Sequence, residues 1–326
     1  MRLLKIFIGF AWAVLGLFVT ADHAYAIFPG VNGKIAFTGN QSGTWQLYTV
    51  NGDGSGLKQI THMPATNDES WLPSFSPDGE RILFSHDPPD DPCGQGVGNC
   101  VDLYVVNADG TGLTRLTHDG ISWAGRWSPD GSEIVFNEIS LPTRQTNVAT
   151  KMRADGTGGR THLSSPFFDT GFSNFTPDGR RLIFYSQAGG LVSAAWIMES
   201  SGENKRRLTP AWLEGGPADI SPDGQEVLLV SQENTDLQNS VYTVNVRSRK
   251  LRRLTHPPGT SVDIVGGYSP DGRKIVFASS RLSSNQSLDL FTMNSDGTDI
   301  RRIVSGITVG GCPDGNCVGP SWGPKR

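Results

Sequence analysis

Beyond the first 26 residues, the chain alternates short apolar runs with turn-forming residues at regular intervals. The phrase Ser-Pro-Asp-Gly, or a near copy, recurs every 45–52 residues. Proline presets φ, aspartate can bond its own backbone, and glycine accepts positive φ, so each copy predicts a tight turn. The turns end at Gly79, Gly131, Gly179, Gly224 and Gly272.

Each turn is followed by an apolar strand, such as Ile82–Phe84, and then by a second strand, such as Leu103–Asn107. An Asp-Gly hairpin signal and a short third strand follow. Another short strand precedes each turn and carries an aromatic residue two positions before the proline, with Ile220 as the exception. Four strands in ~48 residues are typical of one blade of a β-propeller.

The two ends of the repeat region complement each other. Asn32–Phe37 matches the turn and the strand after it, but nothing comparable precedes it. Pro320–Pro324 is a lone copy of the missing strand. We therefore expect an all-β fold, a six-bladed β-propeller closed by a C-terminal strand that completes the first blade. An open array, or seven blades with one degenerate copy, remains the alternative.

The N-terminus has the order of a secretory signal peptide. Arg2 and Lys5 precede a continuous apolar run from Ile6 to Val19, and Ala24–Ala26 forms a small-x-small cleavage site. The run is shorter than the ~20 residues that a membrane-spanning helix needs. We expect a signal peptide at 1–26 and a single propeller domain at 27–326, with no transmembrane segment after cleavage and a periplasmic or secreted location. An uncleaved anchor is the alternative.

Charge and cysteine content narrow the classes of partner and site. A net charge of −4 and a pI near 5.9 disfavour nucleic acid, which requires a basic footprint. Export permits disulfides. The four cysteines form two close pairs in glycine-rich loops, and no histidine lies near either pair, so we expect disulfides rather than zinc. The pairs are Cys93–Cys100 and Cys312–Cys317.

The complete repeat resembles that of the TolB-like propeller family. The resemblance rests on Pro-x-aromatic-Ser-Pro-Asp-Gly, an apolar strand, Leu-Tyr-Val-Val-Asn, Asp-Gly-Thr and Arg-Leu-Thr, and it extends over 32–324. It implies a six-bladed propeller that follows the signal segment directly, without the α/β domain that precedes the propeller in TolB. Members include envelope proteins, propellers of prolyl-oligopeptidase-type peptidases and oligogalacturonide lyases, so the repeat is specific for fold rather than function.

One acidic pattern marks a candidate site. Carboxylates recur seven or eight residues before the repeat proline, where the innermost strand of a blade begins. Such a ring at the channel mouth could hold a cation such as calcium, while a solvated rim is the simpler alternative. Aromatic side chains in the same loops suit recognition of a protein segment or a sugar. The candidates are Glu69, Asp169, Glu214, Asp263, Trp71, Trp123, Phe172 and Trp212.

These features favour a non-catalytic, monomeric scaffold that binds a protein or peptide of the envelope, or a secreted one, or a glycan. No cofactor is predicted. The Gly-x-Ser-x-Gly match around Ser321 lies in a repeat strand, not at a strand-to-helix turn, so no catalytic residue is predicted. The alternative is a carbohydrate-active enzyme, of lyase or glycosidase type, with its chemistry at the channel. The lyase resemblance would imply a metal held by histidines.

The disulfide hypothesis can be checked on the exported protein. Non-reducing peptide mapping should show Cys93 joined to Cys100 and Cys312 to Cys317, because each pair closes a short loop. In the chain-entropy account, each bond stabilises the fold by ~2–3 kcal/mol. Crossed pairs or free thiols would contradict the pairing.

Overall fold

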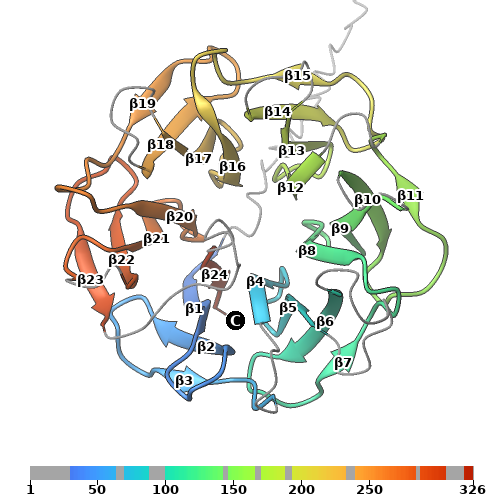
Figure 1. Cartoon of the computed structure of the whole chain (residues 1–326), viewed down its shortest axis with the longest axis horizontal. Coiled ribbons are helices and arrows are strands. Elements are labelled where there is room, and N and C mark those ends of the chain that lie inside the picture. Colours follow the sequence, from blue (N-terminus) through green and yellow to red (C-terminus); the bar gives the residue numbers. More distant parts are fainter. Residues whose placement is uncertain are drawn as a thin grey trace, which may run out of the picture.

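The computed structural model describes residues 30–63, 70–87, 100–141, 146–165, 170–187, 193–232, 239–283, 287–305 and 319–325. All regular elements in these ranges are β-strands. They form six four-stranded sheets arranged around a central axis (Figure 1). The all-β, six-bladed propeller predicted from the repeat is confirmed. No helix in the described part of the chain is long and apolar enough to cross a membrane.

Each blade is an antiparallel sheet whose four strands lie side by side at increasing distance from the axis. We number the blades 1 to 6 from the sheet that contains both chain ends. The innermost strands are β24 (Ser321–Pro324), β4 (Ser70–Phe75), β8 (Ser122–Trp127), β12 (Thr170–Phe175), β16 (Glu214–Ile220) and β20 (Asp263–Tyr268). The second strands are β1 (Asn32–Gly39), β5 (Arg81–His86), β9 (Glu133–Ile139), β13 (Arg181–Ser186), β17 (Glu226–Gln232) and β21 (Lys274–Ser279).

The outermost strand is the shortest strand of each blade. The third strands are β2 (Gln46–Asn51), β6 (Asp102–Asn107), β10 (Asn147–Arg153), β14 (Ala194–Glu199), β18 (Asn239–Asn245) and β22 (Asp289–Asn294). The outermost strands are β3 (Lys58–Gln59), β7 (Thr114–Arg115), β11 (Thr161–His162), β15 (Arg206–Arg207), β19 (Leu251–Arg253) and β23 (Arg301–Val304).

The Ser-Pro-Asp-Gly phrase forms the turn between the first and second strands of blades 2 to 6, in blade 4 with threonine in place of serine. In blade 2, the Ser76 hydroxyl donates to Asp78 Oδ1 (2.5 Å) and accepts the backbone N–H of Arg81 (2.9 Å). Gly79 has φ +70°, which a glycine adopts without strain. The repeat thus fixes where each inner strand ends.

The core lies in the seams between neighbouring blades. The last residue or the last seam residue of each inner strand, an aromatic in five blades and Ile220 in blade 5, packs against two blades at once. Trp127 of blade 3, fully buried, contacts the cluster that contains Leu83 and Leu103 of blade 2 together with Phe136 of its own blade. Neighbouring blades therefore bury the faces that a single sheet would leave exposed.

The C-terminal strand closes the ring. β24 pairs antiparallel with β1, with Trp322 opposite Ile35. The Trp322 indole N–H donates to the Gly33 carbonyl (3.2 Å), and Lys325 N–H donates to Val31 O (2.7 Å). Trp322 packs with Val276 and Leu290 of blade 6 as well as with blade 1. The predicted completion of the first blade is confirmed.

Removing this indole should open the seam. Trp322 is 6% exposed, and Trp212 is 54% exposed. We expect W322A to lower the free energy of unfolding by about 3–5 kcal/mol, the usual cost of truncating a buried tryptophan. The matched variant W212A should change it by less than about 0.5 kcal/mol. Denaturant unfolding measures both, and equal losses in the two proteins would contradict closure by β24.

Candidate functional site

A backbone irregularity recurs in the inner strands and decides which side chains face the axis. Strands β4, β8, β12, β16 and β20 each contain a β-bulge shortly before their last residues. In β4 and β8 the bulge places Leu72 (φ 54°) and Ala124 (φ 56°) in the left-handed region. Bulges re-aim the side chains beside them.

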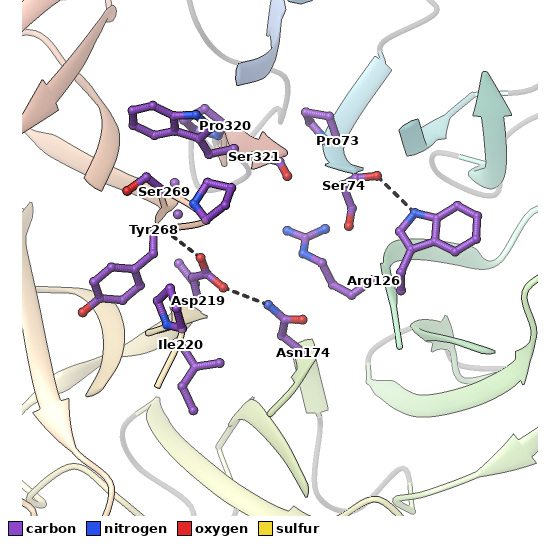
Figure 2. Close-up of a pocket in the computed structure, with 17 residues that line it drawn as sticks. Pro73, Ser74, Arg126, Asn174, Asp219, Ile220, Tyr268, Ser269, Pro320 and Ser321 are labelled. Atoms are coloured by element: carbon purple, nitrogen blue, oxygen red, sulfur yellow. Dashed lines mark hydrogen bonds between the residues drawn. The ribbon is translucent and has the colours of Figure 1, made fainter. Parts of the chain in front are cut away.

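After the bulge, the last two residues of the strand point to opposite faces of the sheet, as in a regular strand. The final residue is the apolar one that enters the seam between blades. The residue before it therefore points away from that seam, toward the axis. These preceding residues converge from all six blades and line one cavity on the axis, which we call the axial pocket (Figure 2). They are Ser74, Arg126, Asn174, Asp219, Gly267 and Ser321.

The axial pocket is small. Its volume is about 50 Å³, which holds only a few water molecules. Pro73 and Pro320 also line it, and a Cβ on Gly266 would lie 2.4 Å from the Pro320 ring. The pocket can therefore admit a single side chain or a chain end, but not a sugar ring enclosed on both faces.

Asp219 is the acidic group of this pocket. Its Oδ2 accepts the backbone N–H of Tyr268 (2.8 Å), and its Oδ1 accepts Asn174 Nδ2 (3.2 Å) (Figure 2). Burial raises the pKa of Asp219 to about 6, although the backbone N–H groups of Tyr268 and Ile220 and the charge of Arg126 act in the opposite direction. Gly267 makes the approach possible, because a Cβ there would lie 2.8 Å from Oδ2.

Arg126 is the basic group. Its Nη1 donates to the carbonyls of Gly125 (3.0 Å) and Leu72 (3.3 Å), which anchor one edge of the guanidinium. Burial lowers the pKa of Arg126 to about 10, while the charge of Asp219 raises it. Arg126 therefore remains a cation at neutral pH, and Figure 2 shows its guanidinium pointing into the pocket.

The two predicted mouth carboxylates that the structure describes, Glu214 and Asp263, differ in burial. Glu214 begins β16 and is exposed. Asp263 is fully buried, where it accepts from the Ser279 hydroxyl (2.6 Å) and forms an ion pair with Arg281 (2.6 Å). Its charge is therefore already compensated within blade 6. Glu69 and Asp169 lie outside the described residues, so a four-membered acidic ring stays a prediction.

The aromatic candidates also differ. Trp123 is partly buried and its indole N–H donates to Asn147 Oδ1 (3.1 Å), whereas Trp212 is exposed beside the start of β16. The side chains of Trp71 and Phe172 lie outside the described residues. So do Cys93, Cys312 and Cys317, and the disulfides stay a prediction. Among the side chains that the structure places, no group of three or more metal-ligating residues is gathered.

Sequence reasoning missed Arg126, Asn174 and Asp219. A signal for them existed, because alternation turns the residue before the seam aromatic toward the other face. Across the six repeats this position is Ser, Arg, Asn, Asp, Gly and Ser, while its neighbours repeat closely. A polar position that varies inside a repeated strand indicates a surface that the fold itself does not require.

Comparison with known proteins agrees with the fold. The model of the TolB beta propeller domain matches residues 16–215. The chain belongs to the TolB beta-propeller family. TolB of the Tol-Pal system from Francisella tularensis subsp. holarctica is 27% identical over 285 residues, which cover 84% of this chain and 59% of that protein. Overall, the chain spans about a third to three fifths of the length of the curated relatives that it matches.

Solved structures support the same architecture. TolB from Acinetobacter baumannii superposes with a TM-score of 0.70 at 20% identity, covering 90% of this chain and 67% of that one. An oligogalacturonate lyase in complex with manganese superposes with a TM-score of 0.55 at 17% identity, covering 86% of this chain and 77% of that one. At these identities the likeness concerns the fold alone.

The acid in the pocket should make stability depend on pH. Asp219 holds its proton more tightly in the folded chain than in the unfolded one, where its pKa is near 3.8. Its contribution to stability is therefore present below about pH 4 and is lost as the pH rises to about 6, by at most about 3 kcal/mol.

D219N should flatten this pH dependence, although its absolute stability falls because an amide nitrogen replaces one acceptor oxygen. The measurement is the free energy of unfolding between pH 4.5 and 7.5, with the exposed D53N as control. A D219N protein with the pH dependence of the parent would contradict the assignment.

Proposed function

We propose that this chain is a non-catalytic, exported scaffold of the cell envelope, working in the periplasm, which binds a protein or peptide partner over the axial pocket. The observation that carries the proposal is the pocket itself. Arg126, Asn174 and Asp219 come from three different blades and converge in a space of about 50 Å³. Pockets that enclose a small-molecule substrate are usually about 300–1,000 Å³. A side chain or a chain end of a larger partner fits this space better.

The family supports a protein partner. One relative is named a Tol-Pal system protein, and its similarity extends over most of this chain. Trp212 and Glu214 are two residues apart in sequence, and both are exposed at the start of β16. A large exposed aromatic side chain of this kind is typical of a contact surface. We propose that the partner contacts this surface and inserts one group into the pocket.

The position of the histidines favours the scaffold over a lyase-type enzyme. All five histidines of 27–326 lie in described ranges, and none lines the axial pocket. His162 binds Glu138 on the outer part of blade 3 (2.8 Å), and His86 is buried against Tyr104. These histidines therefore do not form a set of metal ligands at the axial pocket.

The experiment combines partner capture with activity assays. The exported protein, carrying a photocrosslinker at Trp212, is exposed to envelope extract, and the crosslinked proteins are identified by mass spectrometry. We expect one dominant partner whose capture falls at least tenfold in R126Q. The control is R301Q, because Arg301 lies on the outermost strand of blade 6 and 71% of its side chain is exposed.

A panel of glycans and oligogalacturonides is tested in parallel. Turnover that the parent shows and R126Q lacks would mean that the chain is an enzyme. Capture that is equal in R126Q and R301Q would mean that the partner does not use the pocket.

A further inference from the structure

The axial pocket contains hydrogen-bond donors that the fold does not use, and the strongest of them is cationic. Asp219 is satisfied, since it accepts from Tyr268, Asn174 and the backbone of Ile220. Arg126 uses only Nη1. Its Nε and Nη2 donate no hydrogen bond to any residue that the structure describes. A guanidinium carries five N–H donors in a rigid planar fork, so one full edge of Arg126 remains available.

A second donor faces the same space. Ser321 Oγ accepts the backbone N–H of Phe75 (3.3 Å), which leaves its hydroxyl hydrogen free to donate elsewhere. Figure 2 shows the Ser321 hydroxyl turned toward the centre of the pocket, on the side that Arg126 faces. The two residues belong to blades 1 and 3, so only the closed ring brings them together.

A group that matches these donors must be an acceptor and an anion. Two parallel N–H groups of an arginine fit the two oxygens of a carboxylate, and such charge-assisted pairs are stronger than neutral hydrogen bonds. A phosphate would also accept from arginine, but it is larger and carries up to two charges. The pocket is narrow, and Asp219 already places a carboxylate at its wall.

We infer that Arg126 and Ser321 bind a carboxylate group in the axial pocket, supplied by an acidic side chain or C-terminus of the ligand. This inference rests on the proposed use of the pocket as a binding site. The ligand carboxylate takes the Nε and Nη2 edge of Arg126 and the Ser321 hydroxyl.

Asp219 then controls the binding. Protonated, it places a neutral carboxyl beside the ligand, whereas ionised it repels the ligand's charge. Binding should therefore weaken as the pH rises through about 6, the pKa to which burial raises Asp219.

The surroundings of Asp219 contain few other groups that titrate in this range. Arg126 faces it from β8 as a cation, and β12 presents the amide of Asn174. From β20 come the backbone N–H of Tyr268 and its phenol, whose pKa is raised by burial, so the phenol stays neutral. On β17 the residue opposite Asp219 is Leu228. The pH dependence should therefore follow Asp219 itself.

The test uses formate, the smallest carboxylate, which remains ionised over the range studied. Its binding to the full exported chain is measured by NMR titration at pH 5 and pH 7.5, beside formamide and inorganic phosphate. We expect formate to bind at least tenfold more tightly at pH 5 than at pH 7.5, and formamide to bind far more weakly. D219N should bind formate equally at both pH values.

Variants of the arginine decide the site. R126Q should lose at least tenfold in formate affinity. R126K keeps the positive charge but lacks the planar pair of N–H donors, so it should lose less formate affinity than R126Q. It replaces R126Q as the test variant if R126Q does not fold. R301Q should bind like the parent. Equal formate affinity in the parent, R126Q and R126K would overturn the inference, as would tighter binding of phosphate than of formate.

The outcomes separate this inference from the proposed function. If formate binding depends on Arg126 but no partner is captured, the carboxylate site is supported and the proposed scaffold function is wrong. If partner capture depends on Arg126 but formate does not bind, the scaffold function is supported and the carboxylate site is wrong.

Discussion

Each blade of this propeller has two apolar faces, and a four-stranded sheet cannot bury both of them by itself. The faces are covered only when neighbouring blades pack together, with residues such as Phe75, Trp127 and Trp322 between them. In an open row of blades, the first and the last blade would each leave one apolar face exposed. The pairing of β24 with β1 closes the ring and covers both faces, so the stability of every seam depends on a closed ring.

Closure has a consequence for chemistry as well as for stability. A closed ring brings the inner strands of all blades to one axis, and residues far apart in sequence become neighbours there. Asp219 and Arg126 are partly buried and close enough to influence each other's pKa, although they come from blades 5 and 3. A charge withdrawn from water is costly unless it is bonded, and both groups have backbone partners. The pocket is therefore ordered before any ligand arrives.

Different positions of the repeat determine the fold and line the pocket, which explains how one repeat can occur in proteins with different functions. The turn and seam residues determine the fold, and the blades of this chain repeat them closely. The pocket position lies between them in sequence but carries none of the packing, so it can vary from blade to blade. In this chain the variation leaves two donors, from Arg126 and Ser321, that the fold itself does not use. The fold explains where a ligand would bind, and these side chains explain which chemistry it would need.

The sequence by itself determined the blades, their number and their closure. These features depend on local signals, such as the turn ending at Gly79 and the match between Pro320–Pro324 and its sister strands, and local signals repeat visibly. It also pointed to the axis as the place of the site, but it selected carboxylates at the entries of the inner strands. Among these, Asp263 is bonded to Arg281, which a sequence cannot show because Arg281 lies 18 residues further along, in the turn after β21.

Only the tertiary structure decided that Arg126, Asn174 and Asp219 meet. Strand alternation gives their direction, but the bulges that re-aim them have no clear sequence signal. The pKa of Asp219 likewise depends on burial by other blades and on the proximity of Arg126. Charge, distance and accessibility at the axis are properties of the assembled ring, and no single repeat contains them.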